Sequence, residues 1–254
     1  MAIETLISEY YEELNATDRS IAAYILNNRA KVSEMTIREL AEECHSSKST
    51  VLRFIKKIGI SGFSELKYGL KWEKSRIENE TPYKEDLIND ITMNLEQLRA
   101  WDMDRICRRI ESANRVYVYG TGTEQKRCAE EIKRHFWRLQ KYMYVIDDEM
   151  DLHVLIPTLK EDDLVIIVSL SGNTPSMIPY AKKIAAKNIP LISMTHLRNN
   201  QLSQLTDLNI YAFAYSRESN LSLEVTTFST FFIMAEALFR GYLDYLIKNE
   251  KGSE

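Results

Sequence analysis

Apolar side chains recur at helical spacing in three runs within residues 1–60. Each run follows polar residues of the kind that favour the start of a helix. Thr17-Asp18 precedes the first run, Thr36 with Glu39 forms a capping-box pattern before the second, and Ser47 precedes the third. The apolar positions behind these starts are Ile21, Tyr24 and Ile25, then Leu40 and Ala41, then Val51, Ile55 and Ile58. The pattern predicts three helices in an all-α domain.

The third predicted helix, residues 48–58, has two unlike faces. Its apolar positions share one side, and polar or basic residues repeat at the same spacing on another side, at Ser49, Arg53 and Lys56. Gly59 is well placed to end the helix. A short helix, a turn of three or four residues and a second helix of this kind are typical of a helix-turn-helix, whose second helix enters the major groove of DNA.

Beyond residue 115 the period changes to that of short buried strands. Strands are expected at Val116–Tyr119, Tyr142–Ile146, Leu164–Val168, Leu191–Met194 and Leu208–Tyr211. Helices are expected at Glu124–Leu139, Leu152–Leu159, Pro175–Lys187 and Leu221–Ile247. Strands that alternate with helices predict an α/β domain of three layers, in which a mostly parallel sheet carries helices on both faces.

A polar segment separates these two regions. Residues 75–90 show little apolar periodicity and contain Pro82, and a helical pattern resumes from Leu87 to about Ser112. We therefore expect a helix-turn-helix domain at residues 1–77, a linker with connecting helices at 78–112, the α/β domain at 113–247 and a tail at 248–254.

Composition excludes several classes of protein. The 254 residues are 44% hydrophobic and 28% charged, with a formal net charge of −4, which does not fit disordered, collagen-like or disulfide-scaffold chains. The longest strongly apolar run, Leu164–Leu170, is far shorter than the roughly 18 residues of a membrane span, so no membrane partner is expected. Three cysteines without metal or redox spacing, and an N-terminus without a secretion signal, lead us to expect a cytoplasmic protein without a cofactor.

The whole-chain charge hides a basic island. Residues 45–77 carry eight basic and two acidic side chains, whereas residues 1–44 carry four and nine, and residues 78–254 carry 21 and 26. Because the island covers the second helix of the predicted motif, it favours double-stranded operator DNA as a partner over a merely solvated face. The candidate base-facing residues are Ser47, Lys48, Ser49, Thr50 and Arg53. The candidate phosphate contacts are Lys56, Lys57 and Lys67.

Two loops follow predicted strands at the edge where ligands of parallel sheets bind. One, Ser169–Thr174, precedes a helix, offers three hydroxyl groups, and contains Gly172, which allows the backbone to approach a ligand closely. This first loop lacks the lysine of a P-loop, and the other, Gly120–Thr123, lacks the third glycine of a dinucleotide fingerprint, since Gln125 stands in its place. Helix capping explains either loop alone, but two such loops at one edge favour a phosphate monoester held by neutral donors.

Four stretches of the first 77 residues resemble the N-terminal domain of RpiR-family bacterial transcriptional regulators: Leu14–Ala22, Ile37–Ala41, Ser47–Phe54 and Gly59–Lys67. The resemblance implies a winged-helix-like, homodimeric DNA-binding domain, and leaves open whether dimers pair into tetramers. His45 stands in the turn where the family usually carries glycine. Because histidine is one of the few other residues that adopt a left-handed conformation, we expect the motif to persist.

Residues 115–215, and the last helix after them, resemble the SIS (sugar isomerase) domain, whose phosphate loop reads Ser-x-Ser-Gly-x-Thr. The resemblance implies that Ser169, Ser171 and Thr174 bind the phosphate of a phosphosugar, beside the Gly120–Thr123 loop. The candidate ligand-binding residues are Gly120, Thr121, Gly122, Thr123, Ser169, Ser171, Gly172, Asn173, Thr174 and Glu218.

Three glutamates of this region leave alternatives open. Glu218 stands in a segment that weakly resembles the one supplying a glutamate near the sugar in SIS isomerases, and Glu224 competes for that role. Glu124 occupies a position where the family often has serine. Since a carboxylate repels a phosphate, we expect Glu124 to point toward sugar hydroxyls or away from the site.

The preferred hypothesis is a bacterial transcriptional regulator of carbohydrate metabolism, not an enzyme, whose SIS domain senses a sugar phosphate. The alternatives are a phosphosugar isomerase with Glu218 as its base, and a regulator whose SIS domain only dimerises. An isomerase also needs an electrophile, and no lysine or histidine accompanies the motifs. His135, His153 and His196 share no spacing with metal-ligand partners and are expected to be structural, so neither metal nor catalytic residues are expected.

Overall fold

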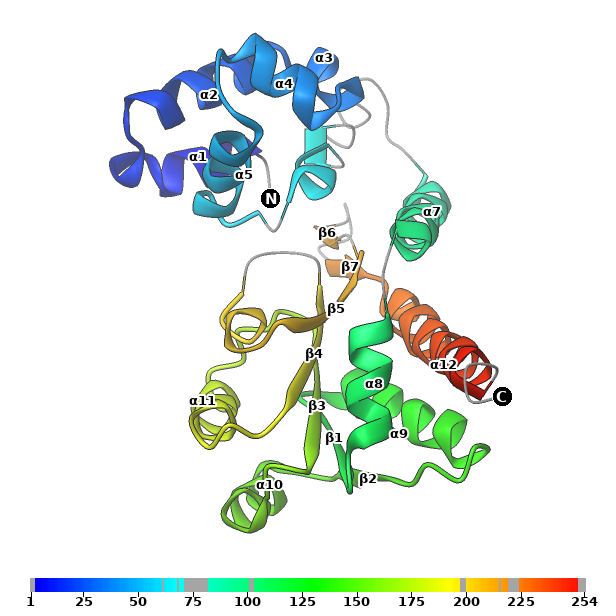
Figure 1. The fold of residues 1–254 in the computed structure, drawn as a ribbon. Helices are drawn as coiled ribbons and strands as arrows, with labels where there is room; N and C mark the ends of the chain where they lie inside the picture. Colours follow the sequence, from blue (N-terminus) through cyan, green and yellow to red (C-terminus); the bar gives the residue numbers. More distant parts are fainter. Residues whose placement is uncertain are drawn as a thin grey trace. The chain divides into compact units, whose positions relative to one another are not determined.

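The computed structural model describes residues 3–60, 62–67, 69–70, 82–100, 103–196, 200–214, 216–218 and 224–250. The chain divides into two units, Met1–Glu85 and Asp86–His196 continued by Asn200–Glu254 (Figure 1). The first unit is helical and the second is α/β, which confirms the fold class predicted from the hydrophobic pattern. No helix among these residues is long and apolar enough to cross a membrane.

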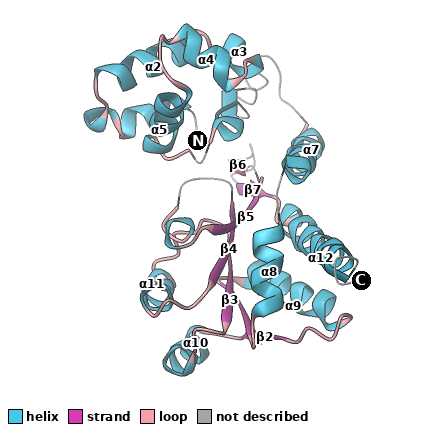
Figure 2. Cartoon of the chain, in the orientation of Figure 1, coloured by secondary structure: helices cyan, strands magenta, loops and turns pink. Residues whose placement is uncertain are grey.

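Helices alone make up the described part of the first unit (Figure 2). They are α1 (Ile3–Glu9), the 3-10 turn η1 (Tyr11–Glu13), α2 (Ala16–Asn27), α3 (Arg29–Glu34), α4 (Ile37–Glu43), α5 (Lys48–Lys57) and a further helical stretch at residues 63–67. Their apolar faces meet in one core that includes Ile21, Leu40 and Phe54. The wing implied by the family resemblance is not found in this part of the chain, because its described residues contain no strand.

Two of the three predicted helix starts are confirmed and one is wrong. Thr36 and Glu39 form the predicted capping box of α4, and the Ser47 hydroxyl caps α5. The cap of α2 is Asn15, rather than the predicted Thr17-Asp18. The prediction failed because asparagine, threonine and aspartate all favour N-caps and stand close together here, so the hydrogen bonds that form decide between them.

Asp18 explains why the cap lies at Asn15. The Asp18 carboxylate accepts the Asn15 backbone N–H (3.2 Å), while the Asn15 side chain accepts the Asp18 N–H (2.9 Å). The same carboxylate is 2% exposed and accepts a hydrogen bond from the Lys57 ammonium at 2.7 Å. A buried charge is costly unless it is paired, so this ion pair fastens the start of α2 to the end of α5.

A five-stranded parallel sheet forms the centre of the second unit, in the order β2-β1-β3-β4-β5. Its strands are β1 (Val116–Gly120), β2 (Met143–Ile146), β3 (Leu164–Ser169), β4 (Leu191–His196) and β5 (Leu208–Ala212). The central strand β3 is buried along its whole length. Such burial on both faces accounts for its unbroken apolar sequence.

Helices cover both faces of the sheet, as predicted (Figure 1). On one face lie α8 (Asp104–Ser112), α9 (Thr123–Trp137) and α12 (Ser229–Glu250). On the other lie α10 (Glu149–Leu155) and α11 (Ile178–Ala186). The remaining described helices are α7 (Tyr83–Ala100), most of which belongs to this unit, and the 3-10 turns η2 (Ile156–Thr158) and η3 (Ser203–Leu205).

The segment before the last helix differs from the prediction. Leu221–Ile247 is predicted as one helix, but α12 begins at Ser229. Glu224–Thr226 instead forms β7, which pairs antiparallel with β6 (Ser216–Glu218). The β-branched run Val225-Thr226-Thr227 favours a strand, and a count of apolar residues at helical spacing does not register this preference.

One ion pair ties β1 to β3 at their amino ends. Arg115, just before β1, donates two hydrogen bonds of 2.8 Å to the carboxylate of Asp163, which is fully buried just before β3. The Lys160 N–H donates to the same carboxylate at 2.8 Å. Burial raises the pKa of Asp163, but the hydrogen bonds from Arg115 and Lys160 outweigh burial and hold this pKa below its ordinary value.

Asp163→Asn is expected to lower the free energy of unfolding at pH 7 by about 1–3 kcal/mol, because the amide loses the charge that pairs with Arg115. The folded pKa of Asp163 is depressed, so its contribution is present above about pH 4 and is lost as the pH falls through the folded pKa. Urea unfolding of both proteins from pH 7 to pH 3 checks this prediction.

The free energies of unfolding of the wild type and of Asp163→Asn should converge toward pH 3. Asp162→Asn, at the exposed neighbouring position, is the matched control and should leave the pH dependence unchanged. A gap between wild type and Asp163→Asn that stays constant across the range contradicts the prediction.

Candidate functional site

The turn between α4 and α5 spans residues 44–47 and completes a helix-turn-helix. His45 has a left-handed backbone (φ 47°), so it replaces the usual glycine as predicted. The Ser46 N–H closes the turn by donating to the Ala41 carbonyl (2.8 Å). Val51 and Phe54 of α5 are buried in the same core as Ala41, which leaves the opposite face of α5 in solvent.

That open face of α5 carries most of the candidate DNA contacts. Its exposed members are Ser47, Lys48, Ser49, Arg53 and Lys56. The Ser47 hydroxyl lies 2.8 Å from the Ser49 hydroxyl and 2.9 Å from that of the half-buried Thr50. Hydroxyls beside basic side chains, at the start of a helix, offer donors and acceptors that suit base edges in the major groove.

The other two candidate phosphate contacts are placed differently. Lys57 is 31% exposed, and its ammonium donates to the buried Asp18 carboxylate. The structure therefore assigns Lys57 a stabilising contact inside the unit. Lys67 is half-buried and lies near Glu39. The pKa of Glu39 is lowered mainly by its hydrogen bonds from Thr36, and to a smaller extent by the positive charge of Lys67.

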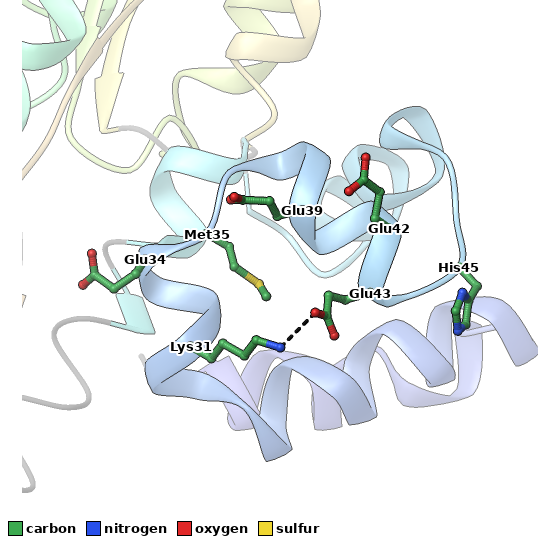
Figure 3. A pocket seen from close by; sticks show the side chains of 7 residues that line it. All are labelled: Lys31, Glu34, Met35, Glu39, Glu42, Glu43 and His45. Carbon is green, nitrogen blue, oxygen red and sulfur yellow. Dashed lines mark hydrogen bonds and ion pairs between the residues drawn. The ribbon is translucent and has the colours of Figure 1, made fainter.

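A second surface of this unit is acidic (Figure 3). It is a hollow lined by Lys31, Glu34, Met35, Glu39, Glu42, Glu43 and His45. Lys31 donates to the Glu43 carboxylate at 2.9 Å, which with the Tyr24 hydroxyl lowers the pKa of Glu43. Because carboxylates repel DNA phosphates, this surface disfavours a duplex and the open face of α5 is the electrostatically favoured side.

The neighbouring lysines Lys56 and Lys57 are expected to separate DNA affinity from stability. Lys57→Met leaves Asp18 buried without its cation and should destabilise the first unit by up to about 3 kcal/mol. Lys56→Met should cost less than about 1 kcal/mol, since interactions of an exposed lysine contribute little to stability, yet it should weaken DNA binding and reduce its salt slope by about one.

Urea unfolding and fluorescence anisotropy with a labelled random-sequence duplex at several salt concentrations measure both effects. Each variant is the control for the other, since both replace a lysine at the end of α5 by methionine. Equal losses of stability in the two variants, or an unchanged salt slope in Lys56→Met, contradict the prediction.

The two candidate ligand loops meet at the carboxyl ends of β1 and β3. The chain leaves β1 toward β2 on one side and leaves β3 toward β4 on the other, so the direction of the connections reverses between them (Figure 1). Open α/β sheets bind ligands at this switch point. The Thr121 N–H donates to the Val168 carbonyl (3.0 Å), and this hydrogen bond joins the two loops where they leave their strands. Gly122 is the N-cap of α9, and the exposed Thr123 is its first residue.

The loop after β3 holds its hydroxyl groups in a small network. The buried Ser169 hydroxyl accepts the Gly172 N–H at 3.2 Å and lies 3.2 Å from the Thr174 hydroxyl. The exposed Ser171 hydroxyl accepts the Asn173 N–H at 3.1 Å. Ser169 therefore shapes the loop from inside, whereas Ser171 and Asn173 stand on its accessible side.

Two glycines permit close approaches in these loops. Gly172 has φ 65°, and a Cβ at this position would lie 2.0 Å from Asn200 Oδ1. A Cβ at Gly120 would lie 2.4 Å from the backbone of Gln125 in α9. Neither distance is compatible with a side chain, so both loops depend on glycine for their shape.

The buried Asn200 is a site-supporting residue that the sequence analysis missed. Its side chain is 3% exposed and donates to a threonine hydroxyl at the end of β4 (3.1 Å). The two residues after it, Gln201 and Leu202, donate their N–H groups to the Asn173 side chain (2.9 Å) and the Gly172 carbonyl (3.0 Å). This segment braces the loop after β3, but it contains no motif that would mark it in the sequence.

The three glutamates are not brought together as one described cluster. Glu124 is exposed and pairs with Arg127 of its own helix at 2.8 Å. Glu218 ends β6 and Glu224 begins β7, opposite one another in the hairpin. The side chains of both, and residues 219–223 between them, lie outside the described residues, so the choice between Glu218 and Glu224 stays a prediction.

The histidines of this unit have structural partners. His135 is buried and lies 3.1 Å from Glu131 and 3.0 Å from Glu236, which connects α9 to α12. His153 packs edge-on against an α11 ring, and His196 bonds to the Ala214 carbonyl. Within the described ranges, no group of three or more histidine, cysteine or acidic side chains is arranged to hold a metal ion.

Gly172→Ala is expected to deform the phosphate loop, because alanine disfavours a positive φ by roughly 1–2 kcal/mol and its Cβ would collide with Asn200. The variant should melt at a lower temperature and should no longer be stabilised by any sugar phosphate that stabilises the wild type. Differential scanning fluorimetry measures both quantities. Gly62→Ala is the control, because a Cβ there meets no atom within 4 Å; wild-type stability and binding in Gly172→Ala contradict the prediction.

The sequence matches two family models, the helix-turn-helix domain of the rpiR family over residues 1–76 and the SIS domain over residues 109–239. The chain is similar to the HTH-type transcriptional regulator GlvR of Bacillus subtilis (strain 168). The two are 42% identical over 245 residues, which cover 96% of each chain.

Solved structures with the same fold belong to more than one class of protein. NanR of Vibrio vulnificus, solved in complex with ManNAc-6P, is 21% identical with a TM-score of 0.51, and the match covers 97% of each chain. A hypothetical protein of Methanococcus jannaschii, for which 3-hexulose-6-phosphate isomerase function was inferred, is 22% identical with a TM-score of 0.52 over 65% of this chain and 90% of that one. At these identities the likeness establishes the shared fold.

Proposed function

The chain belongs to the rpiR family of helix-turn-helix transcriptional regulators that carry a SIS domain, and we propose that it binds operator DNA as a homodimer and responds to a sugar phosphate. One observation carries this proposal. The same chain contains an exposed, basic helix, α5, and a loop with hydroxyl groups at the switch point of a parallel sheet.

On the DNA side, the exposed start of α5 would meet base edges and its later basic residues would meet phosphates. Ser47, Lys48, Ser49 and Arg53 have the short or charged donors that suit base edges, with the half-buried Thr50 beside them. Lys56, with Lys67 at the flank, would position the duplex. A homodimer would place two such helices on two half-sites, which is how helix-turn-helix proteins match palindromic operators.

On the ligand side, neutral donors favour a phosphate monoester. Ser171 and Thr174 present hydroxyls next to backbone N–H groups that now bond within the loop, at 3.1 and 3.2 Å. A phosphate would take over these donors. The sugar phosphate bound by NanR supports this ligand class for the same fold.

An isomerase is the second candidate, because a solved protein of the same fold has an inferred isomerase function. Isomerisation needs a base aimed at carbon and an electrophile for the developing enolate. The sequence offers Glu218 as a base, but no lysine or histidine stands beside the motifs as the electrophile. We favour the regulator, since the relative that is 42% identical along almost the whole chain is a regulator.

A thermal-shift screen tests the ligand half of the proposal. The panel contains glucose 6-phosphate, N-acetylmannosamine 6-phosphate and the 6-phosphates of maltose and trehalose, each against its unphosphorylated sugar. We expect at least one phosphate to raise the melting temperature of the wild type but not of Ser171→Ala, with Ser112→Ala as control. Turnover of that compound by the wild type would favour the isomerase, and no shift with any panel member contradicts sugar-phosphate sensing.

A matched pair of arginine variants tests the DNA half. Arg53→Ala should weaken specific operator binding by roughly tenfold to 100-fold, the range for one lost base contact. Arg240→Ala, which removes an exposed arginine of α12, is the control for charge and should bind as the wild type does. Electrophoretic mobility shift with the promoter region upstream of the gene measures both; unchanged binding in Arg53→Ala contradicts the assigned recognition helix.

A further inference from the structure

Buried polar groups attach the helix α7 to the sheet, in addition to the apolar contact of Leu98 with the core. It buries Asp90 (2% exposed) and Asn94 (0%), while Leu87, Ile88 and Leu95 of the same helix are exposed. Buried polar side chains in proteins are almost always hydrogen-bonded. The partners of Asn94 therefore identify what positions this helix.

Asn94 bonds to the backbone immediately after β5. Its Nδ2 donates to the Phe213 carbonyl (2.9 Å), and its Oδ1 accepts the Phe213 N–H (2.9 Å). The Nδ2 also donates to the Asp90 carbonyl one turn earlier (2.7 Å). The Asn94 amide thus pairs with Phe213 as the backbone of a neighbouring strand would, and it fixes α7 at one position along the sheet edge.

The same edge is connected to the phosphate loop. His196, the last residue of β4, donates its backbone N–H to the Leu170 carbonyl in that loop (3.0 Å). Its ring nitrogen Nε2 bonds to the carbonyl of Ala214, the residue after Phe213. A continuous series of contacts therefore runs from the loop after β3, through the ends of β4 and β5, to Asn94 on α7.

The position of α7 in the chain gives this series a consequence. The division between the two units falls inside α7, between Glu85 and Asp86. The helix α7 is therefore the element of the described SIS domain from which the chain continues to the helix-turn-helix unit. A contact that fixes α7 therefore acts on the segment through which the chain joins the two units.

We propose that Asn94 is the positioning residue that couples the ligand site to DNA binding. This inference rests on the proposed function. A sugar phosphate that takes over donors of the loop after β3 shifts Leu170 and with it His196 and the Ala214–Phe213 backbone, and the Asn94 amide transfers this shift to α7. The ligand changes operator affinity only if it favours one arrangement of this edge over another.

Asn94→Ala separates coupling from the two binding events. Operator affinity is measured by fluorescence anisotropy on the full chain, with and without the panel compound that stabilises the wild type, tested first with N-acetylmannosamine 6-phosphate. We expect the wild type to show a ligand effect within the usual five- to 150-fold range and the variant to show less than about a threefold effect. Thermal stabilisation by the compound should persist in the variant.

A second variant and a second measurement keep the test decisive if Asn94→Ala folds poorly. His196→Ala removes the ring contact to Ala214 and should reduce the ligand effect in the same way. Hydrogen exchange of residues 83–100 should respond to the compound in the wild type and not in either variant. Asn249→Ala is the control for the loss of an asparagine side chain. It removes the hydrogen bond that Asn249 Nδ2 donates to the Tyr245 carbonyl (2.8 Å) within α12.

The outcomes distinguish this inference from the proposed function. A ligand effect of wild-type size in both variants overturns the coupling role and leaves the regulator intact. Loss of compound binding in Asn94→Ala would make Asn94 a support of the ligand site, which also overturns coupling. A wild type whose operator affinity does not respond to any panel member that it binds overturns the proposed response, and the inference with it.

Discussion

The parallel pairing of β1 with β3 is the constraint on which the rest of the second unit depends. The register from Val116 opposite Leu164 to Gly120 opposite Val168 places the ends of both strands side by side. The ion pair of Arg115 with the buried Asp163 fixes that register at one end, and it leaves the other end free to carry loops. Since the chain leaves these strands in opposite directions, the loops with glycine and hydroxyl groups border the same position.

The fold could be predicted largely from local patterns, and the errors have local causes too. Apolar spacing and caps such as Thr36 with Glu39 mark helices because each depends on residues within one turn. The start of α2 was misplaced because three cap-forming residues compete, and Lys57 of a distant helix favours the arrangement with Asn15 as cap. The β6–β7 hairpin was missed because the helical apolar count ignores the strand preference of β-branched residues.

The candidate site divides in the same way. Ser169, Ser171 and Thr174 stand within six residues, so their spacing carried the prediction of a phosphate loop. Asn200 and Asn94 act on this edge from other parts of the chain, and no sequence spacing relates them to the loop. Lys57 illustrates the converse. Its charge and its position in the sequence predict a contact with DNA phosphate, whereas the fold shows that its ammonium pairs with the buried carboxylate of Asp18.

The kind of contact at Asn94 also limits how α7 can move. An apolar contact tolerates sliding, because its strength depends on area rather than direction. The Asn94 amide instead forms two directional bonds with one residue, Phe213, which is itself 2% exposed. A displaced α7 would leave a buried N–H and carbonyl without partners, at a cost of about 1–3 kcal/mol for each group. These bonds therefore hold α7 in one position relative to Phe213, so that a shift of the Phe213 backbone carries α7 with it, which is the property that the proposed coupling requires.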